Sequence, residues 1–274
     1  MNILELINEK NKSLKDEFKG SLSVSKLCNE YIKNKFDDIG QAIKCAKKGE
    51  NDPTYKYAGM NVDEILNQWQ EKSNKSKHYG KLLDDFSGII LNNEQDVLSL
   101  WKLDNNYDND NLLQNLCNGF LQFYNFIITN TNYKFIGREI PLYLTTLKGD
   151  KINGRLDNLF YDINTNAYII IDYKITENIT IKNNYGEKLL GPAYMLDECD
   201  MNLYTIQLHI YKKALVDTYN LTTYDKVSVY VCNLLRNSFN NINYKLYKQN
   251  FVFNPEQLDS FIEFGATKHK LLKF

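Results

Sequence analysis

The chain has 274 residues, of which 43% are hydrophobic and 13% aromatic, enough to bury a sizeable core in one large domain or in two lobes. Its formal net charge of −1 gives no bulk attraction to a polyanion, so any nucleic-acid binding depends on where the lysines lie. No apolar run is long enough to cross a membrane, and the first residues lack the basic start of a signal peptide. We therefore expect a cytoplasmic protein without membrane contact.

The first hundred residues have a helical pattern. Ser23 and Asn61 each precede an amphipathic run and are residue types that cap helix N-termini. The stretch from Gly49 to Pro53 has the composition of a linker between two of these helices. We predict an N-terminal helical lobe over residues 1–110.

The region from residue 111 to 274 mixes both periodicities. A helix with one apolar face is followed by three strands, then by a second helix and an apolar strand. By themselves these elements support a mixed α/β domain. The expected ranges are Leu112–Thr129 and Met201–Tyr219 for the helices, and Tyr133–Leu144, Lys151–Tyr161, Ala167–Ile175 and Lys226–Leu234 for the strands.

Two acids lie on neighbouring strands of a predicted hairpin. The residues from Asp162 to Asn166 are turn formers, and a turn centred on Asn164-Thr165 sets Asp157 directly opposite Asp172. Opposed residues have Cβ atoms about 4.5–5.5 Å apart. Two carboxylates that close repel each other unless a proton or a cation lies between them. A divalent metal fits such a site, and oxygen ligands favour Mg²⁺ or Mn²⁺.

The second strand adds a lysine to the same face. Side chains alternate along a strand, so Asp172 and Lys174 point one way and Tyr173 points into the other layer. The apolar run before them leads both charges toward a core, where charge is costly unless it is paired or metal-bound. An alternative interpretation is an ion pair of Asp172 and Lys174 with no chemistry.

The helix predicted over residues 201–219 carries a polar pair. Gln207 and Tyr211 are four residues apart, so they lie on one helix face, and Tyr204 extends that stripe by one turn. The alternative is an ordinary amphipathic helix with a solvated glutamine and a core tyrosine.

Taken in order, the motifs G-x-x-D, D-x-K and Q-x-x-x-Y resemble the PD-(D/E)xK nuclease superfamily, particularly its RecB-like branch and phage exonuclease relatives. The resemblance implies a restriction-endonuclease-like core of α-β-β-β-α-β order, in which helices flank a central mixed sheet. It also implies that Lys174 orients or deprotonates the attacking water, and that Gln207 and Tyr211 line the cleft. The implied metal ligands are Asp157, Asp172 and the main-chain carbonyl of Tyr173.

One position departs from the family pattern. Relatives carry a tryptophan helix followed by a small-residue turn, G-T-x-x-H, whose histidine can ligate metal. Here Trp69 is followed by Gly80-Lys81-Leu82-Leu83-Asp84, with Asp84 in place of the histidine. Either the aspartate keeps a metal site with a different charge, or this position has left the site. Glu139 on the first core strand is a further candidate for a second metal position, or else pairs with Arg138 or a strand neighbour.

These motifs predict a Mg²⁺-dependent deoxyribonuclease, an exonuclease of phage-type DNA processing or recombination that acts in the host cytoplasm if phage-encoded. The alternatives are a structure-selective endonuclease, or a nuclease-fold subunit that binds DNA or a partner without cutting. The chain has no P-loop, so a helicase or a single-strand annealing or binding protein is an expected partner beside DNA. Candidates for a DNA-binding face, or else a solvated surface, are Lys182, Lys188, Lys245, Lys248, Lys268 and Lys270.

The cysteine pattern argues against an iron–sulfur cluster. Iron–sulfur relatives of this core need an upstream cysteine and three more near the C-terminus, whereas the five cysteines here are scattered without any C-x-x-C motif. We therefore expect reduced, mostly buried thiols. They are Cys28, Cys45, Cys117, Cys199 and Cys232.

Overall fold

A computed structural model describes residues 3–33, 37–130, 132–220, 223–239, 242–248 and 253–271. Contacts along the chain divide it into two units, one of residues 1–33 and 114–274 and one of residues 34–113. This division differs from the predicted lobe over residues 1–110, because the first 33 residues group with the sheet. They do so because β1 pairs with β3, and because Val24 and Leu27 lie in the core cluster that includes the sheet.

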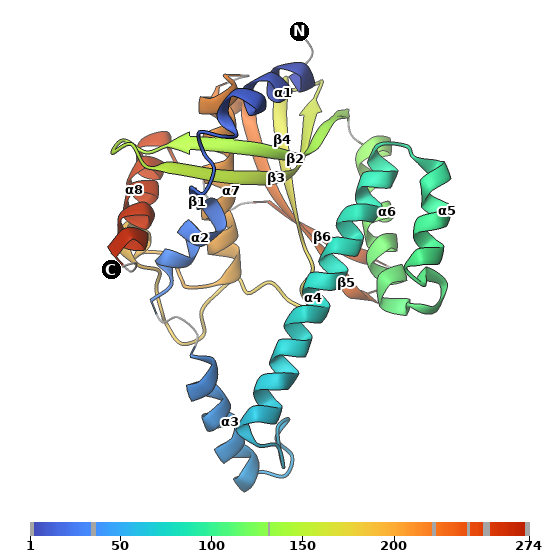
Figure 1. Ribbon diagram of the computed structural model, residues 1–274, viewed down its shortest axis with the longest axis vertical. Helices are drawn as coiled ribbons and strands as arrows, with labels where there is room; N and C mark the ends of the chain where they lie inside the picture. Colours follow the sequence, from blue (N-terminus) through green and yellow to red (C-terminus); the bar gives the residue numbers. More distant parts are fainter. Residues whose placement is uncertain are drawn as a thin grey trace. The chain divides into compact units, whose positions relative to one another are not determined.

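The first unit contains the sheet and most of the helices (Figure 1). Its helices are α1 (Ile3–Leu14), α2 (Val24–Cys28), α6 (Asn111–Asn130, which begins in the other unit), α7 (Asp200–Tyr219) and α8 (Pro255–Leu271). Its strands are β1 (Leu22–Ser23), β2 (Tyr133–Thr145), β3 (Lys151–Asp162), β4 (Ala167–Lys174), β5 (Val227–Phe239) and β6 (Ile242–Lys248). Short 3₁₀ turns lie at Asn29–Tyr31, Gly191–Ala193 and Tyr224–Lys226.

The sheet is mixed. Its order is β1-β3-β4-β5-β6, with β2 on the other edge of β3. The pairs β2–β3, β3–β4 and β5–β6 are antiparallel, whereas β4–β5 and β1–β3 are parallel. A parallel β4–β5 pair needs a long crossover, which α7 supplies. The succession α6-β2-β3-β4-α7-β5 confirms the predicted mixed α/β core, to which β1, β6 and α8 are additions that the periodicity did not predict.

The hairpin between β3 and β4 has the turn that its composition predicts. The carboxylate of Asp162 accepts the main-chain N–H of Asn164 at 2.9 Å and the hydroxyl of Thr165 at 2.7 Å. Asn166 takes a left-handed φ of 54°, a conformation that asparagine tolerates better than most residues. This turn sets the register, and the paired residues from Asn158↔Ile171 onward have numbers that add to 329, as predicted.

The two faces of β4 are covered by different helices. Tyr173 packs edge-to-face against Phe120 and Phe123 of α6, with ring centroids 5.6 and 5.8 Å apart. On the opposite face, the ammonium of Lys174 lies 4.9 Å from the ring centroid of Tyr204 of α7. The predicted alternation is therefore confirmed. Because both faces are covered, β4 is a nearly continuous buried run rather than an alternating one.

The second unit is helical. Its helices are α3 (Asp38–Asn51), α4 (Val62–Leu91) and α5 (Gln95–Asp104), with a 3₁₀ turn at Tyr107–Asn109. Asn61 caps α4 as predicted, since its side chain accepts the N–H of Glu64 while the Glu64 carboxylate accepts the N–H of Asn61. One end of α4 packs on α3 around Ile65, and the other packs Phe86 against Trp101 of α5 at 5.3 Å between ring centroids.

Candidate active site

An opening in the sheet lies beside the stretch from Gly154 to Asp157. On one edge of β3, residues 152–153 pair with β1 and residues 158–162 pair with β4. Among the described residues, no strand pairs with the four residues between on that edge, although β2 runs along the other. A cleft of about 390 Å³ lies here, and its walls are Ser23, Val24, Ser25, Glu139, Asn153, Gly154, Arg155, Asp157, Asp172, Lys174, Gln207 and Tyr211. All five residues predicted to be catalytic therefore line one cleft.

Asp157 and Asp172 lie at the point where β3 and β4 separate. They occupy the register position that follows the last ladder pair, Asn158↔Ile171. Instead of a ladder bond, the Asp157 carboxylate accepts the main-chain N–H of Tyr173 through Oδ2 at 2.8 Å. This bond holds one acid beside the main chain of the strand that carries the other.

The side chain of Asp157 is unfavourable as an anion. Burial of Asp157 and the charge of Asp172 raise the pKa of Asp157 to about 8, against the lowering effects of Lys174 and of the Tyr173 N–H. In the absence of a cation, a proton is therefore favoured on Asp157 near neutral pH. When two carboxyl groups share a buried site in this way, a bound cation can take the place of the proton that one of them would otherwise hold.

Lys174 forms a close ion pair with Asp172. Its Nζ lies 2.5 Å from Oδ2 of Asp172, and the Asp172 side chain is only 5% exposed. This ion pair compensates the charge of the buried Asp172 carboxylate. Burial alone lowers the pKa of Lys174, but the charges of Asp172 and Asp157 outweigh it and the net shift is upward. The lysine is therefore an ammonium group at neutral pH.

Gln207 and Tyr211 bring α7 to the same cleft. The Gln207 amide donates through Nε2 to the Tyr211 hydroxyl at 2.9 Å and to Oγ of Ser25 at 3.2 Å. Burial and the charge of Asp172 raise the pKa of Tyr211 to about 12, so it remains a neutral phenol. Ser25 was missed by sequence reasoning, which treated the segment only as a helix start after Ser23. Nothing local to Ser25 signals a contact with a residue 182 positions away.

Glu139 continues the row of acids onto β2. In the β2–β3 register it lies opposite Asp157, between the pairs Arg138↔Asn158 and Ile140↔Leu156. Its φ of 52° is left-handed, a conformation that costs a non-glycine residue about 1–3 kcal/mol. The Glu139 carboxylate contacts Nε of Arg155 at 2.5 Å, the strand-neighbour pairing that was its alternative interpretation. A metal role for Glu139 stays a prediction.

Asp84 belongs to the second unit. The expected small-residue turn at Gly80 does not form, because α4 runs without interruption from Val62 to Leu91. Asp84 is an exposed residue of that helix, on the same helix as Trp69. Its role as a metal ligand stays a prediction. Within the described parts of the chain, no group of three or more histidine, cysteine, aspartate or glutamate residues is placed to hold a metal ion.

Several lysines proposed for a DNA-binding face have other partners. Lys188 contacts Asp197 at 2.6 Å, and Lys268 donates to the main-chain carbonyl of Glu30 at 2.6 Å. Lys270 forms a short ion pair with Asp150. These contacts favour the solvated-surface interpretation for half of that set.

Gly154 is required by close packing in the cleft wall. A Cβ atom at this position would lie 2.8 Å from Cε1 of Tyr211 and 3.1 Å from Cγ2 of Val24. We expect Gly154→Ala to lower the free energy of unfolding by about 1–3 kcal/mol, because the tyrosine must move. Gly80→Ala is the matched control, since no atom lies within 4 Å of its Cβ position and α4 is helical there. It should raise the stability by about 0.4–1 kcal/mol. Urea denaturation of both variants measures the difference, and equal stabilities would contradict the packing argument.

Comparisons with known proteins add only distant similarities. No protein-family model matches the chain, and neither does any curated protein. Among solved structures, a crystal structure named "Putative exonuclease", from Eubacterium rectale, is similar with a TM-score of 0.43 and 14% identity, over 88% of this chain and 84% of that chain. The crystal structure of SSO0001 is similar with a TM-score of 0.35 and 12% identity, over 97% of this chain and 84% of that chain.

The helices within the described ranges include none that is both long and apolar enough to span a bilayer.

Proposed function

We propose that this protein is a metal-dependent nuclease that hydrolyses phosphodiester bonds in DNA, as an exonuclease of phage-type DNA processing or recombination. The observation that supports it is the convergence of three separate motifs on one cleft. Asp157 comes from β3, Asp172 and Lys174 from β4, and Gln207 and Tyr211 from α7. A structural ion pair of Asp172 and Lys174 alone would need neither the facing acid nor the polar pair from the helix.

The donor set suits a hard divalent cation. Asp157 and Asp172, with the main-chain carbonyl of Tyr173, would hold Mg²⁺ or Mn²⁺, which prefer oxygen ligands and keep several waters. Such an ion supplies positive charge beside the phosphate and makes a bound water nucleophilic near neutral pH. One observation fits the assignment. Burial and the charge of Asp172 raise the pKa of Asp157, so this carboxylate is unfavourable without a cation beside it.

The remaining side chains would position the substrate. Because Lys174 is an ammonium group, its suitable roles are to bind a phosphate oxygen and to orient water, rather than to act as a general base. Asp172 holds the lysine at the cleft through the ion pair. Tyr211 and Gln207 present a neutral hydroxyl and a neutral amide that can donate to a phosphate or to a base without adding negative charge.

The function is tested with the purified protein, end-labelled linear DNA and covalently closed circular DNA, in the presence of Mg²⁺, Mn²⁺ or EDTA. We expect linear DNA to be degraded with either metal, and no cleavage in EDTA. Cutting of closed circles would mean that the endonuclease alternative is right. If no substrate were cleaved with any metal, the chain would be a non-cutting subunit and the proposal would be wrong.

The absence of a P-loop in the sequence leads to a proposal about partners. A helicase or a single-strand annealing or binding protein would supply or receive the DNA strand. Co-purification with tagged protein from the native cell, with nuclease-treated extract as control, checks this.

A further inference from the structure

The second unit contains a groove that the nuclease site does not use. It has a volume of about 980 Å³ and lies where the loop before α4 meets the first half of that helix. Leu66, Trp69 and Ser73 line it at helical spacing, and Tyr57 closes it from the loop. The indole N–H of Trp69 donates to the Tyr57 hydroxyl at 2.7 Å, and the two rings meet edge-to-face with centroids 6.0 Å apart. This pair places a partly exposed, rigidly held tryptophan in the groove wall.

Lysines lie beside these aromatic rings. The Nζ of Lys56 is 4.9 Å from the ring centroid of Tyr57, and Lys72 lines the groove from α4. A third, Lys48, lies 4.3 Å from the centroid of the neighbouring Tyr55. Aromatic side chains interleaved with cations are the combination that binds unpaired nucleotides, because every base has a face to stack and every linkage carries a charge.

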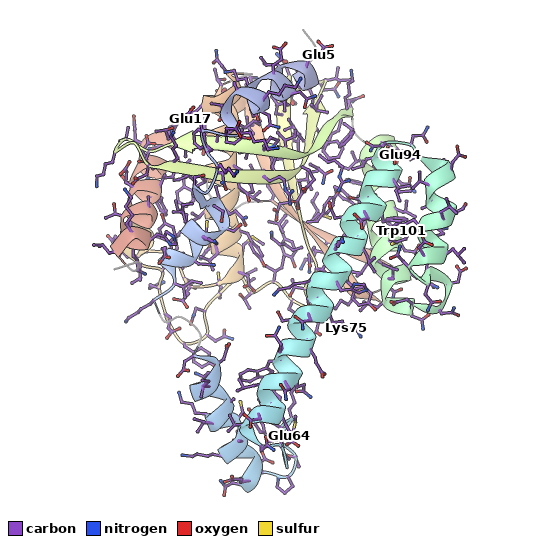
Figure 2. The ribbon with its side chains drawn as sticks, in the orientation of Figure 1. Glu5, Glu17, Glu64, Lys75, Glu94 and Trp101 are labelled. Atoms are coloured by element: carbon purple, nitrogen blue, oxygen red, sulfur yellow. The ribbon has the colours of Figure 1, made fainter. Side chains whose placement is uncertain are left out.

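The basic character continues along α4 beyond the groove. From residue 72 to residue 83 the helix holds four lysines and no acid, namely Lys72, Lys75, Lys77 and Lys81. All four are exposed, and Lys75 extends from the middle of the helix, between the part packed on α3 and the part packed on α5 (Figure 2). This stretch buries Tyr79, Leu82 and Leu83 and exposes its four lysines to solvent. Its charge is complementary to a phosphate chain.

The groove also offers groups that can contact base edges. The side-chain amides of Asn67, Gln68 and Gln70 line it and provide both donors and acceptors. In a duplex the Watson–Crick edges are paired and the base faces are stacked, so amides beside a partly exposed tryptophan favour an unpaired strand. Asp38 is the acid among the described lining residues, and it lies at the start of α3.

We propose that this groove, together with the lysine-bearing stretch of α4, binds an unpaired strand of the DNA substrate. The inference rests on the proposed nuclease function for the identity of the ligand. It adds a binding site in the second unit that is separate from the residues of the cleft.

The experiment measures binding without cleavage. Full-length protein in EDTA is titrated with labelled oligothymidine, and both the anisotropy of the label and the tryptophan fluorescence are followed. Trp69→Ala should weaken binding about 5- to 150-fold, whereas Trp69→Phe, which keeps a ring to stack, should retain most of the affinity. Quenching of the tryptophan signal should disappear in Trp69→Phe, because the remaining Trp101, on α5, is buried against Phe86 of α4.

Charge variants test the groove while keeping its aromatic side chains. The double variant Lys56→Gln with Lys72→Gln should weaken binding and reduce the slope of log affinity against log salt by about 1.4, or about 0.7 for each lost contact. Lys102→Gln is the matched control, because Lys102 lies 5.0 Å from the ring centroid of Tyr107 in the same unit but outside the groove. It should bind like the wild type. If Trp69→Ala proves to be unfolded by circular dichroism, the lysine variants still test the site.

Other outcomes would overturn the inference. Unchanged affinity in both the tryptophan and the lysine variants would show that the groove is not the site. Three further results would each mean a different ligand. The variants could lose affinity for blunt duplex DNA as much as for oligothymidine, or the protein could bind oligouridine and not oligothymidine. Polyglutamate could also compete as strongly as oligothymidine does. Groove-dependent binding of oligothymidine without any metal-dependent cleavage would keep this inference while removing the nuclease activity.

Discussion

Lys174→Met and Asp172→Asn are each expected to lower the rate of DNA cleavage by about 10²–10³-fold or more, the cost of removing one preorganised charged group from an active site. Lys174→Met removes the ammonium that would bind the phosphate. Asp172→Asn removes a proposed metal ligand and also the partner that holds Lys174 at 2.5 Å. Initial rates on end-labelled linear DNA, at saturating Mg²⁺, measure the effect.

A matched control for these variants lies on α7. Lys213 is also a largely buried lysine, with ion pairs to Asp217 at 3.0 Å and to Asp259 at 3.3 Å, but it does not line the cleft. Lys213→Met should therefore keep full activity, while its free energy of unfolding falls by an amount comparable to that in Lys174→Met. Lys174→Arg should not restore the rate, because a planar guanidinium cannot take the place of a compact ammonium. Full activity in Lys174→Met would show that the site is assigned wrongly.

Asp157→Asn is expected to stabilise the metal-free protein. The Asp157 pKa is raised in the folded state to about 8, well above its value in an unfolded chain. As the pH rises from about 4 to about 8, the unfolded chain releases this proton while the folded protein retains it, so folding becomes less favourable. The asparagine keeps an acceptor for the N–H of Tyr173 but cannot ionise. We expect a gain of about 1–3 kcal/mol near neutral pH that falls to nothing near pH 4.

Urea denaturation in EDTA at several pH values tests this sign. Asp172→Asn is the comparison, because it removes the partner of Lys174 and should destabilise the protein instead. In EDTA we expect Asp157→Asn to be more stable than the wild type. Adding Mg²⁺ should reverse this order of stability, since the wild type gains stability by binding the ion and Asp157→Asn gains little. A destabilised Asp157→Asn protein in EDTA would contradict the raised pKa of Asp157.

The hairpin that carries Asp157 and Asp172 was predictable because its determinants are local. The turn from Asp162 to Asn166 is specified by residues that bond within it, and the period of two then sets which side chains face each other. The relation between Asp157 and Asp172 follows from that register alone. The helical spacing of Gln207 and Tyr211 is local in the same way, so their bond within α7 was also predictable.

Other parts of the site depend on contacts between distant segments. Ser25 reaches Gln207 only because α2 packs on α7, and the opening at Gly154 exists because β1 takes part of the β3 edge that β4 leaves. The small-residue turn of the family motif is a different case. The motif places it at Gly80, whereas α4 continues through Gly80 to Leu91, and the role of Asp84 as a metal ligand stays a prediction.

The sequence by itself determined the mixed α/β order, the hairpin register and the identity of five cleft residues, because strand alternation, turn chemistry and helix spacing act over a few residues. The tertiary structure decided which segment completes the cleft, that residues 1–33 group with the sheet, that Glu139 pairs with Arg155, and that Lys174 is charged. Those features depend on burial and on charges brought together by packing, and neither is encoded at any one position of the chain.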